Sequence, residues 1–512
     1  RHRRRAGRPR CRRLRPDPAS ARTSSERTAM SGLLMTGTSS DAGKSALVTG
    51  LCRVAARRGI DVVPFKSQNM SNNSMVCPDG AEIGRAQYLQ ATAAGVVPEA
   101  RMNPVLLKPG TDRRSFIVLM GSPAGELDAG EYATGRRRLA EAAFDAYADL
   151  AARHELVLCE GAGSPAEINL RSGDYVNMGL ARRFTLPTVI IGDIDRGGVL
   201  ACLYGTWALL EEADRALLRG YVINKFRGDA SILDPGLDEI DRRTGMRDYG
   251  VLPWLPDVWI DGEDSLRVDR WARDEDPGRS ALHVAVVRLP RISNATDVEA
   301  LAAEPGVDVQ VTDDPRVAER ADLLVLPGSR AAVDDLAWLA GRGLGEVVVR
   351  RHAQGRPVLG ICGGYEMLAE QLDDGVESRS GLVPGLGLLP VRVLFDDDKT
   401  VRVATHDHRG TAVTGYEIHH GRCRIDGGEP FLDGVRSANT WGTMLHGCLE
   451  NDDFRRALLS EVAALTGSGW SPDERADGYA QRRERMIETL ADAMTEHLDV
   501  DALLALAKES AR

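Results

Sequence analysis

Residues Thr36–Ser45 read TGTSSDAGKS and stand between a run of β-forming residues and a helical pattern. Glycines let backbone N–H groups turn towards phosphate oxygens, and the helix that follows offers its N-terminus to the same anion. Lys44 is then placed to reach the β- and γ-phosphates of a nucleotide, and the Ser45 hydroxyl to bind Mg²⁺. Five residues separate Gly37 from Gly43, one more than in the common phosphate loop. The residues predicted to form this nucleotide site are Gly37, Thr38, Gly43, Lys44 and Ser45.

Short β-forming runs alternate with helical patterns from residue 31 to about residue 253, and the alternation starts again at residue 283. Such alternation is typical of parallel sheets wrapped by helices, so we expect two α/β domains. The first helix is expected at Ser45–Arg58, with Gly59 ending it in the left-handed C′ position. The expected strands are Gly32–Thr36, Val62–Lys66, Leu156–Cys159, Thr188–Ile191, Tyr221–Asn224, His283–Leu289, Val307–Val311, Leu323–Leu326 and Pro357–Ile361.

The stretch Trp271–Ser280 (WARDEDPGRS) is charged and carries Pro and Gly, as interdomain linkers do. The predicted divisions are therefore an N-terminal domain at 30–270, a linker at 271–280 and a C-terminal domain at 281–512. A helical segment at about 479–507 is expected to close the chain.

The composition is that of a globular protein: 43% of the 512 residues are hydrophobic and 27% are charged. Residues 1–29 differ, since they hold 11 arginines and two acids and show no apolar periodicity, so we expect a disordered upstream extension. Without these nine net positive charges the formal charge of −10 becomes −19, which disfavours nucleic acid and anionic membranes as partners. The eight cysteines include no C-x-x-C pair and no secretory signal is seen, which favours reduced thiols in a cytoplasm.

Two further segments support a nucleotide-binding N-terminal domain. Glu160 ends an apolar strand in LVLCEGAG, where its carboxylate is placed to bind Mg²⁺ or a water on that ion. Asn224 and Lys225 follow another strand in INKFRGD and resemble the base-recognition segments of P-loop proteins. The alternatives are an ordinary glutamate at a strand end and an ordinary polar loop.

A second centre is indicated at Val358–Leu368, which reads VLGICGGYEML. Small residues between a β-run and a helix permit the sharp turn of a nucleophile elbow, which would expose the Cys362 thiol. The following helix N-terminus is expected to lower the thiol pKa, and a buried structural cysteine is the alternative. His446, downstream in MLHGCLE, is the predicted base, and backbone N–H groups at Gly328 and Gly363 are predicted to form an oxyanion hole.

These segments and several others in the same order resemble the cobyric acid synthase family, the glutamine-hydrolysing amidoligases of cobalamin biosynthesis. The resemblance runs from residue 30 to about residue 495. Its N-terminal part is similar to dethiobiotin synthetase-type P-loop ligases and its C-terminal part to class I glutamine amidotransferases, which implies two corresponding α/β folds. The other segments that carry it are Pro64–Asn73 (PFKSQNMSNN), Ala81–Gly95 (AEIGRAQYLQATAAG), Met102–Pro109 (MNPVLLKP), Cys159–Leu170 (CEGAGSPAEINL), Asp193–Val199 (DIDRGGV), Ser293–Asp297 (SNATD) and Gly415–Gly421 (GYEIHHG).

The resemblance implies a reaction and its participants. ATP phosphorylates a carboxylate of adenosylcobyrinic acid a,c-diamide, ammonia from glutamine displaces the phosphate, and the cycle repeats at the b, d, e and g side chains. It also implies that Cys362 is the nucleophile and His446 the base, with Ser45 and Glu160 at Mg²⁺. Polar residues outside both centres suit recognition of a large ring with amides and carboxylates, although loop capping is the alternative. These candidates are Lys66, Gln68, Asn69, Asp195, Asn294 and Asp297.

One position departs from the usual class I pattern. Two residues after His446, where such glutaminases carry a glutamate, this chain has Cys448. The residue that orients His446 is therefore open, with Glu450 and Glu417 as candidates. Two alternative interpretations of the whole chain are a cobyrinic acid a,c-diamide synthase and a P-loop ATPase with a non-catalytic glutaminase-like module. The segments QNMSNN and SNATD argue against the first, and the intact cysteine and histidine against the second.

Overall fold

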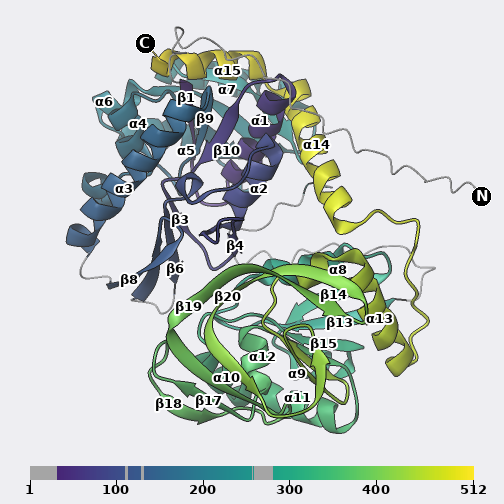
Figure 1. Cartoon of the computed structure of the whole chain (residues 1–512). Coiled ribbons are helices and arrows are strands. Elements are labelled where there is room, and N and C mark those ends of the chain that lie inside the picture. The colour runs from purple at the N-terminus through teal and green to yellow at the C-terminus, as the bar shows by residue number, and fades with distance from the viewer. Residues whose placement is uncertain (1–30, 110–113, 129–131, 257, 259–280, 512) are drawn as a thin grey trace, which may run out of the picture.

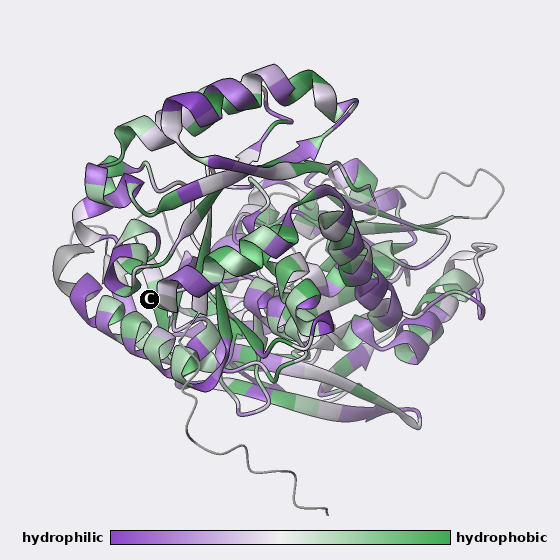
Figure 2. Ribbon diagram, turned by 90° about the horizontal axis from the view of Figure 1, so that it is seen from above, coloured by the Kyte–Doolittle hydropathy of each residue, from purple (hydrophilic) through white to green (hydrophobic). Residues whose placement is uncertain are grey.

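The computed structural model describes residues 31–109, 114–128, 132–256, 258 and 281–511. It consists of two α/β domains, the N-terminal one at the top of Figure 1 and the C-terminal one below it. Figure 2 shows hydrophobic strands in the middle of the molecule and a mixture of hydrophilic and hydrophobic residues along the outer helices. The predictions for residues 1–29 and for the linker at 271–280 lie outside the described residues.

The N-terminal domain is built on six parallel strands in the order β12-β11-β10-β1-β9-β2. The inner strands are buried on both faces, which is why they read as almost continuous apolar runs. The predicted parallel sheet wrapped by helices is confirmed. The strands are β1 (Ser31–Gly37), β2 (Val62–Phe65), β9 (Leu156–Glu160), β10 (Thr188–Asp193), β11 (Leu218–Phe226) and β12 (Arg247–Pro253).

Helices cover both faces of this sheet. Gly59 follows the first of them with a φ of 74°, as predicted for a left-handed cap. Within the described ranges, no helix is both long and apolar enough to cross a membrane. The helices are α1 (Lys44–Arg57), α2 (Arg85–Ala94), α3 (Tyr132–Arg153), α4 (Met178–Phe184), α5 (Val199–Leu209), α6 (Glu212–Arg215) and α7 (Asp234–Thr244).

Two small sheets extend the N-terminal domain towards the C-terminal one (Figure 1). Their strands were not predicted, because strands of three to seven residues with polar side chains show little periodicity. One sheet has the order β3-β6-β7-β8, and the other pairs β4 with β5. The strands are β3 (Gln68–Met70), β4 (Ser74–Val76), β5 (Glu82–Gly84), β6 (Val105–Pro109), β7 (Arg114–Leu119) and β8 (Ser122–Asp128).

The C-terminal domain has a seven-stranded sheet in the order β14-β13-β15-β16-β23-β22-β21, parallel from β14 to β23. The second predicted α/β domain is thus confirmed. Its strands are β13 (Leu282–Val287), β14 (Val307–Thr312), β15 (Leu323–Leu326), β16 (Val358–Ile361), β21 (Glu429–Phe431), β22 (Gly434–Ser437) and β23 (Thr440–Thr443). Its helices are α8 (Glu299–Ala302), α9 (Pro315–Arg320), α10 (Ala332–Gly341), α11 (Leu344–Ala353), α12 (Gly363–Leu368) and α13 (Asp452–Thr466).

A long hairpin, β19 (Val391–His408) and β20 (Thr411–Ile425), curves over the C-terminal domain on the side that faces the N-terminal one (Figure 1). It belongs to a sheet of order β18-β17-β19-β20, with β17 at Gln371–Asp374 and β18 at Gly381–Pro384. Tyr416 and Ile418 of the hairpin are buried with Val76 of β4 in a small apolar cluster. The hairpin therefore forms part of the domain boundary.

Hydrogen bonds also join the two domains directly. Ser74 N donates to Asn294 Oδ1 at 2.9 Å, and Ala295 N donates to Asn73 Oδ1 at 3.2 Å. Asn294 N donates to the Asn72 carbonyl at 3.3 Å. Asn294 adopts a left-handed backbone, with a φ of 49°, which asparagine tolerates better than most residues. The segments PFKSQNMSNN and SNATD thus meet at the boundary.

The last helices, α14 (Tyr479–His497) and α15 (Val500–Ala507), return to the N-terminal domain, where the yellow ribbon of Figure 1 ends. Apolar residues of both join the core around α1. Gly50 of α1 lies so close to α14 that a Cβ on it would stand 2.2 Å from the Met494 sulfur. The predicted segment at 479–507 is thus two helices, and its apolar face packs on the N-terminal domain although it falls in the range predicted for the C-terminal one.

Candidate active sites

The phosphate loop connects β1 to α1, so it stands at the carboxyl end of the parallel sheet, where such folds bind ligands. Gly43 has a φ of 100°, and a Cβ on it would lie 2.1 Å from Asn224 Nδ2. Thr38 N donates to a β10 carbonyl at 2.9 Å. Lys44 is buried, and its Nζ donates to the Ser39 carbonyl at 3.0 Å. The loop therefore has the compact glycine-dependent shape that an anion site requires.

Glu160 ends β9 beside this loop and is completely buried. Ser45 Oγ and Lys66 Nζ each donate to its Oε1 at 2.9 Å, while Gln90 and Gln87 donate to Oε2 at 2.5 and 3.4 Å. Burial alone would raise its pKa, but the Lys66 charge and these hydrogen bonds hold the pKa of Glu160 below its usual value. An ionised carboxylate beside a serine hydroxyl supplies the oxygen ligands that Mg²⁺ prefers.

The side chains of Asn224 and Lys225 bind the backbone of the phosphate loop. Asn224 Nδ2 donates to the Ala42 carbonyl at 2.9 Å, and Lys225 Nζ donates to the Asp41 carbonyl at 2.6 Å. Lys225 also forms an ion pair with Asp193 at 2.6 Å. Both side chains therefore shape the loop, and base recognition by them stays a prediction.

Cys362 occupies the turn between β16 and α12 with a φ of 50° and a ψ of −113°, a strained conformation for a residue with a side chain. The glycines that follow let this turn press against the loop after β15. A Cβ on Gly363 would be 2.7 Å from Ser329 N, and one on Gly364 would be 2.0 Å from the Leu326 carbonyl oxygen. The sharp turn of the predicted elbow is present.

The Cys362 thiol is buried, with 5% of the residue exposed, whereas the elbow pattern predicted an exposed thiol. Burial raises its pKa well above the usual value, the Glu366 and Asp297 carboxylates add to this, and the Gly363 N–H opposes it. The expected low pKa is therefore wrong, because desolvation and two nearby carboxylates outweigh the N-terminus of a six-residue helix. Forming the thiolate requires a base next to it.

His446 follows β23, which is the parallel neighbour of β16, so base and nucleophile stand at the same end of adjacent strands. His446 Nδ1 lies 2.6 Å from Asp297 Oδ2, and Asp297 Oδ1 accepts from Gly447 N at 2.9 Å. Both side chains of the pair are almost fully buried, and the Tyr416 ring stacks on the imidazole at 5.3 Å. With the proton on Nδ1 engaged by a carboxylate, Nε2 is left as the basic nitrogen.

Asp297 thus has the place of the orienting residue that the sequence left open. The two candidates considered are engaged elsewhere: Glu450 pairs with an N-terminal-domain arginine at 2.6 Å and Glu417 with a β19 arginine at 2.9 Å. Asp297 was predicted to bind substrate, because 149 residues separate it from His446 and only the tertiary structure brings them together. The feature of the sequence that could have identified Asp297 is its place as the acidic residue of SNATD, one of the segments that carry the family resemblance.

Gly328 lies in the loop after β15, next to the base. A Cβ on it would be 2.8 Å from the Ser293 carbonyl oxygen and 3.1 Å from His446 Cε1. The next residue, Ser329, is the one that touches Gly363. The two glycines predicted to carry the oxyanion donors therefore belong to loops in direct contact, as an oxyanion hole requires.

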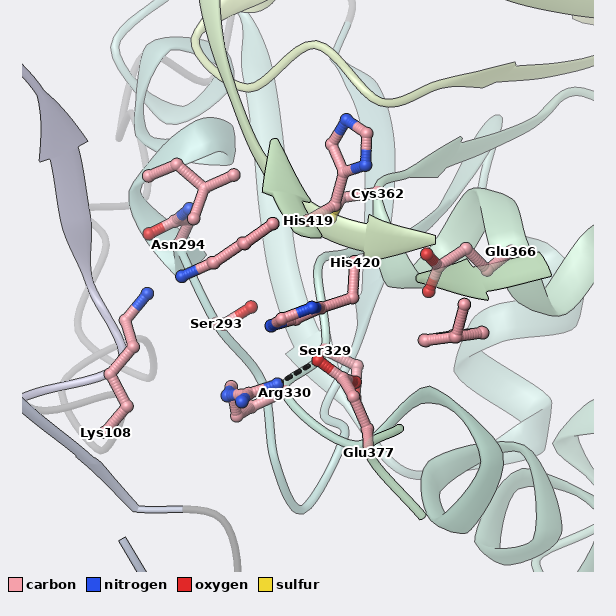
Figure 3. A pocket seen from close by; sticks show the side chains of 13 residues that line it. Lys108, Ser293, Asn294, Ser329, Arg330, Cys362, Glu366, Glu377, His419 and His420 are labelled. Atoms are coloured by element: carbon pink, nitrogen blue, oxygen red, sulfur yellow. Dashed lines mark hydrogen bonds and ion pairs between the residues drawn. The ribbon is translucent and has the colours of Figure 1, made fainter. Parts of the chain in front are cut away.

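A pocket opens beside Cys362 at the domain boundary (Figure 3). Most of its wall comes from the C-terminal domain, and Lys108 of β6 reaches in from the N-terminal one. Glu366 lines it, and burial together with Glu377 and Asp374 raises the pKa of Glu366 to about 8. The lining residues are Lys108, Ser293, Asn294, Ser329, Arg330, Cys362, Glu366, Glu377, Phe395, Lys399, Ile418, His419 and His420.

Four of the six residues predicted to bind the substrate are buried. Lys66 pairs with Glu160, and Asn69 Nδ2 donates to a glutamine of α2 at 3.0 Å. Asn294 lies in the domain boundary and Asp297 against the base. Other protein groups engage these four side chains, and their direct contact with a large ring stays a prediction.

The remaining two candidates reach the surface. Gln68 accepts a hydrogen bond from the Tyr175 hydroxyl, and Asp195 forms an ion pair with Arg227 after β10. Both are partly or fully solvent-accessible, so substrate contact by Gln68 and Asp195 stays a prediction.

Two family models match the chain: the CobQ/CobB/MinD/ParA nucleotide binding domain at residues 33–267, and the CobB/CobQ-like glutamine amidotransferase domain at residues 283–454. Together with the fold, these matches define a chain that joins a nucleotide-binding domain to a glutamine amidotransferase domain. The cobyric acid synthase of Cutibacterium acnes is 64% identical over 94% of this chain and 100% of its own length. Those of Mycobacterium tuberculosis and Mycolicibacterium gilvum are 55% and 54% identical, each over 94% of this chain and 97% of their own. The chain belongs to the cobyric acid synthase family.

Proposed function

We propose that this chain is a glutamine-dependent amidoligase that converts adenosylcobyrinic acid a,c-diamide to adenosylcobyric acid, by amidation of the b, d, e and g carboxylates. The observation that carries the proposal is the 64% identity to a cobyric acid synthase along that relative's whole length. It is supported by a phosphate loop and a Cys–His–Asp arrangement in one chain.

In the C-terminal domain, Cys362 attacks the side-chain amide carbon of glutamine. His446 takes the thiol proton and returns it to the departing ammonia, while Asp297 stabilises the imidazolium that forms between these steps. Backbone N–H groups at the two loop glycines donate to the oxyanion. Water then hydrolyses the thioester, which releases glutamate and restores the thiol.

In the N-terminal domain, a substrate carboxylate attacks the γ-phosphate of ATP and forms an acyl phosphate and ADP. Lys44 compensates the charge that builds on the transferred group. Ammonia then attacks the acyl carbon, forms the amide and expels phosphate. Activation is needed because a carboxylate is a poor electrophile, and a local ammonia supply helps because free ammonia is mostly protonated at neutral pH.

Ser45 and Glu160 are the residues that would hold Mg²⁺ at this site. Their oxygens lie 2.9 Å apart at the phosphate loop, and the carboxylate has a lowered pKa, which fits a hard cation. When bound, the ion supplies charge neutralisation to the phosphates.

Product masses test the proposal. The protein is incubated with the a,c-diamide, ATP, Mg²⁺ and glutamine, and the corrinoids are followed by mass spectrometry. Four successive amidations are expected, with partly amidated intermediates free in solution, because one fixed pose presents only one carboxylate to the phosphate. A product that stops after one amidation, or conversion of cobyrinic acid to the a,c-diamide alone, would assign the chain to the sister synthase. Absence of glutamate formation would favour a non-catalytic module.

A further inference from the structure

We propose that the α-carboxylate of glutamine binds to two lysines at the domain boundary, Lys108 of β6 and Lys399 of β19, so that the N-terminal domain completes the glutamine site of the C-terminal one. The inference rests on the proposed function and adds the residues that select the nitrogen donor. The two lysines, here called the lysine pair, take no part in bond breaking, and their role is to recognise the free amino acid.

The position of Lys108 follows from the alternation of side chains along β6. Val105 and Leu107 belong to an apolar cluster of the N-terminal domain, so Lys108 points to the opposite face of the strand. Figure 3 shows Lys108 directed from the N-terminal ribbon towards the pocket that Cys362 lines. Only 4% of Lys108 is exposed, so its charge is held inside the domain boundary and not in solvent.

One buried carboxylate holds the lysine pair together. Lys108 and Lys399 both form ion pairs with Glu82 of β5, which is completely buried, and Lys399 Nζ lies 2.7 Å from Glu82 Oε2. Burial alone would raise the pKa of Glu82, but the two ammonium groups hold this pKa well below its usual value. The cluster therefore carries one negative and two positive charges, and the excess positive charge attracts an anion.

Both lysines keep donors that these ion pairs do not use. A lysine ammonium has three N–H groups. Lys108 donates to Glu82 and, at 2.9 Å, to Ser74 Oγ. Among the residues that the structure describes, Lys399 donates to Glu82 alone. Within that part of the chain, one N–H of Lys108 and two of Lys399 are therefore left for a ligand in the pocket. Burial lowers the pKa of Lys108 to about 8, against the effect of Glu82, and a bound anion would stabilise the charged form.

The other charged residues of the pocket fit the same orientation of glutamine. Attack by Cys362 fixes the side-chain amide of glutamine at the thiol, so the α-carbon end extends into the pocket that the lysine pair lines. Arg330 also lines this pocket, but it pairs with Glu377 and lies 3.8 Å from the centre of the Phe116 ring, so less of its charge is available. Glu377 and Glu366 supply acidic groups on the same wall for the α-ammonium group.

Recognition of the α-carboxylate separates free glutamine from other primary amides. The proposed reaction makes such amides on the corrinoid side chains, and each of them resembles the reacting end of glutamine. None of these product amides has a carboxylate three carbons from the amide carbon together with an amino group. A charged anchor at the far end of the pocket therefore directs the Cys362 thiol to free glutamine and away from the amides of the product.

Two amides that differ only at the α-carbon test the proposal on the wild-type protein. 4-Aminobutanamide keeps the reacting amide and the amino group of glutamine and lacks the carboxylate. Its kcat/KM, measured as ammonia release, should be more than about tenfold below that of glutamine, because the charge-assisted hydrogen bonds to the carboxylate are lost. A smaller difference would overturn the proposal.

Lys108→Met then assigns the effect to the N-terminal domain, because it keeps the length of the side chain and removes its charge. The KM for glutamine should rise at least about tenfold while kcat stays within about threefold, since this contact is the same in the ground state and the transition state. The kcat/KM for 4-aminobutanamide and amidation from ammonium salt should both stay within about threefold. Arg379→Met is the matched control: it removes an ion pair with Glu126 across the boundary, outside the pocket wall, and should change the glutamine KM less than about twofold.

An unchanged glutamine KM in Lys108→Met, or equal losses for glutamine and 4-aminobutanamide, would overturn the proposal. If this variant does not fold because Glu82 loses a partner, Lys108→Met combined with Glu82→Gln removes the ion pair as a unit, and the same comparison of the two amides applies. Should that protein not fold either, the wild-type ratio for the two amides decides. Failure of the proposed function is distinct: the wild type would then release no glutamate from glutamine, or would form no amide even from ammonium salt.

Discussion

Replacing Asp297 by asparagine removes an acceptor without changing the volume of the side chain. The carboxylate accepts from two donors, His446 Nδ1–H at 2.6 Å and Gly447 N–H at 2.9 Å. Asparagine has one acceptor oxygen, so its NH₂ group must face one of these donors. Either the imidazole or the adjacent backbone loses its partner, and the imidazolium loses the negative charge that compensates it.

The expected size of the effect follows from the burial of the pair. A hydrogen bond to a charged group contributes about 1.5–3 kcal/mol, and each 1.4 kcal/mol of transition-state stabilisation is a factor of about ten in rate. Asp297→Asn should therefore lower kcat/KM for glutamine hydrolysis by roughly 10- to 150-fold. Most of the decrease should fall on kcat, because the imidazolium exists only during the reaction.

Glutamate release from glutamine measures this effect, and amidation from ammonium salt shows whether the rest of the protein is intact. The second activity should persist, since the phosphate site lies in the other domain. Asp452→Asn, at the start of α13 in the same domain, is the control, because this carboxylate binds Arg455 and the Tyr479 N–H instead of the base. Glutaminase activity of Asp297→Asn within about threefold of the wild type would refute the orienting role.

Cys362→Ala should abolish amidation from glutamine and keep amidation from ammonium salt; loss of both in a folded protein would contradict two separate centres. Lys44→Ala should remove amidation with either nitrogen source while glutaminase continues, and turnover from ammonium salt would count against the phosphate loop. Glu366 has a pKa raised from 4.5 to about 8, so the folded chain keeps a proton that the unfolded chain releases. Stability is therefore lost as pH rises from about 5 to 8, by about 2 kcal/mol between pH 6 and pH 8. Denaturant unfolding of Glu366→Gln should lack this loss, and equal pH slopes for both proteins would contradict it.

Many strands of the two central sheets were predictable because the inner ones are apolar on both faces and alternate with helices, whereas β12, β21, β22 and β23 were not predicted. Leu323–Leu326 coincides with β15, and Leu156–Cys159 is one residue shorter than β9. The short strands β3, β4 and β5 were not found, since three residues carry no measurable period. The hairpin of β19 and β20 was missed too, because it is half exposed and its charged residues hide the alternation.

For the candidate sites too, features set by neighbouring residues could be predicted, and features set by contacts between distant residues could not. The Cys362 elbow and the phosphate loop are each formed by one continuous segment, so their strained or left-handed turns could be predicted. The partnership of Asp297 with His446 could not, because it depends on packing between distant segments. The high thiol pKa was missed for a related reason: the helix after Cys362 is visible in the sequence, whereas its burial near Glu366 is not.

The return of α14 and α15 has a consequence for biogenesis. Met486, Leu490 and Met494 complete the core around α1, a helix that leaves the ribosome several hundred residues before them. The N-terminal domain is therefore translated first, but its core is completed last. The apolar side of α1 that packs on α14 stays exposed while the C-terminal domain is translated. A nascent chain in this state is prone to aggregation and suits chaperone capture. A stop codon between residue 454 and α14 would give a truncated chain that still contains all the residues of both centres. That chain would lack the two helices that complete the hydrophobic core of the N-terminal domain.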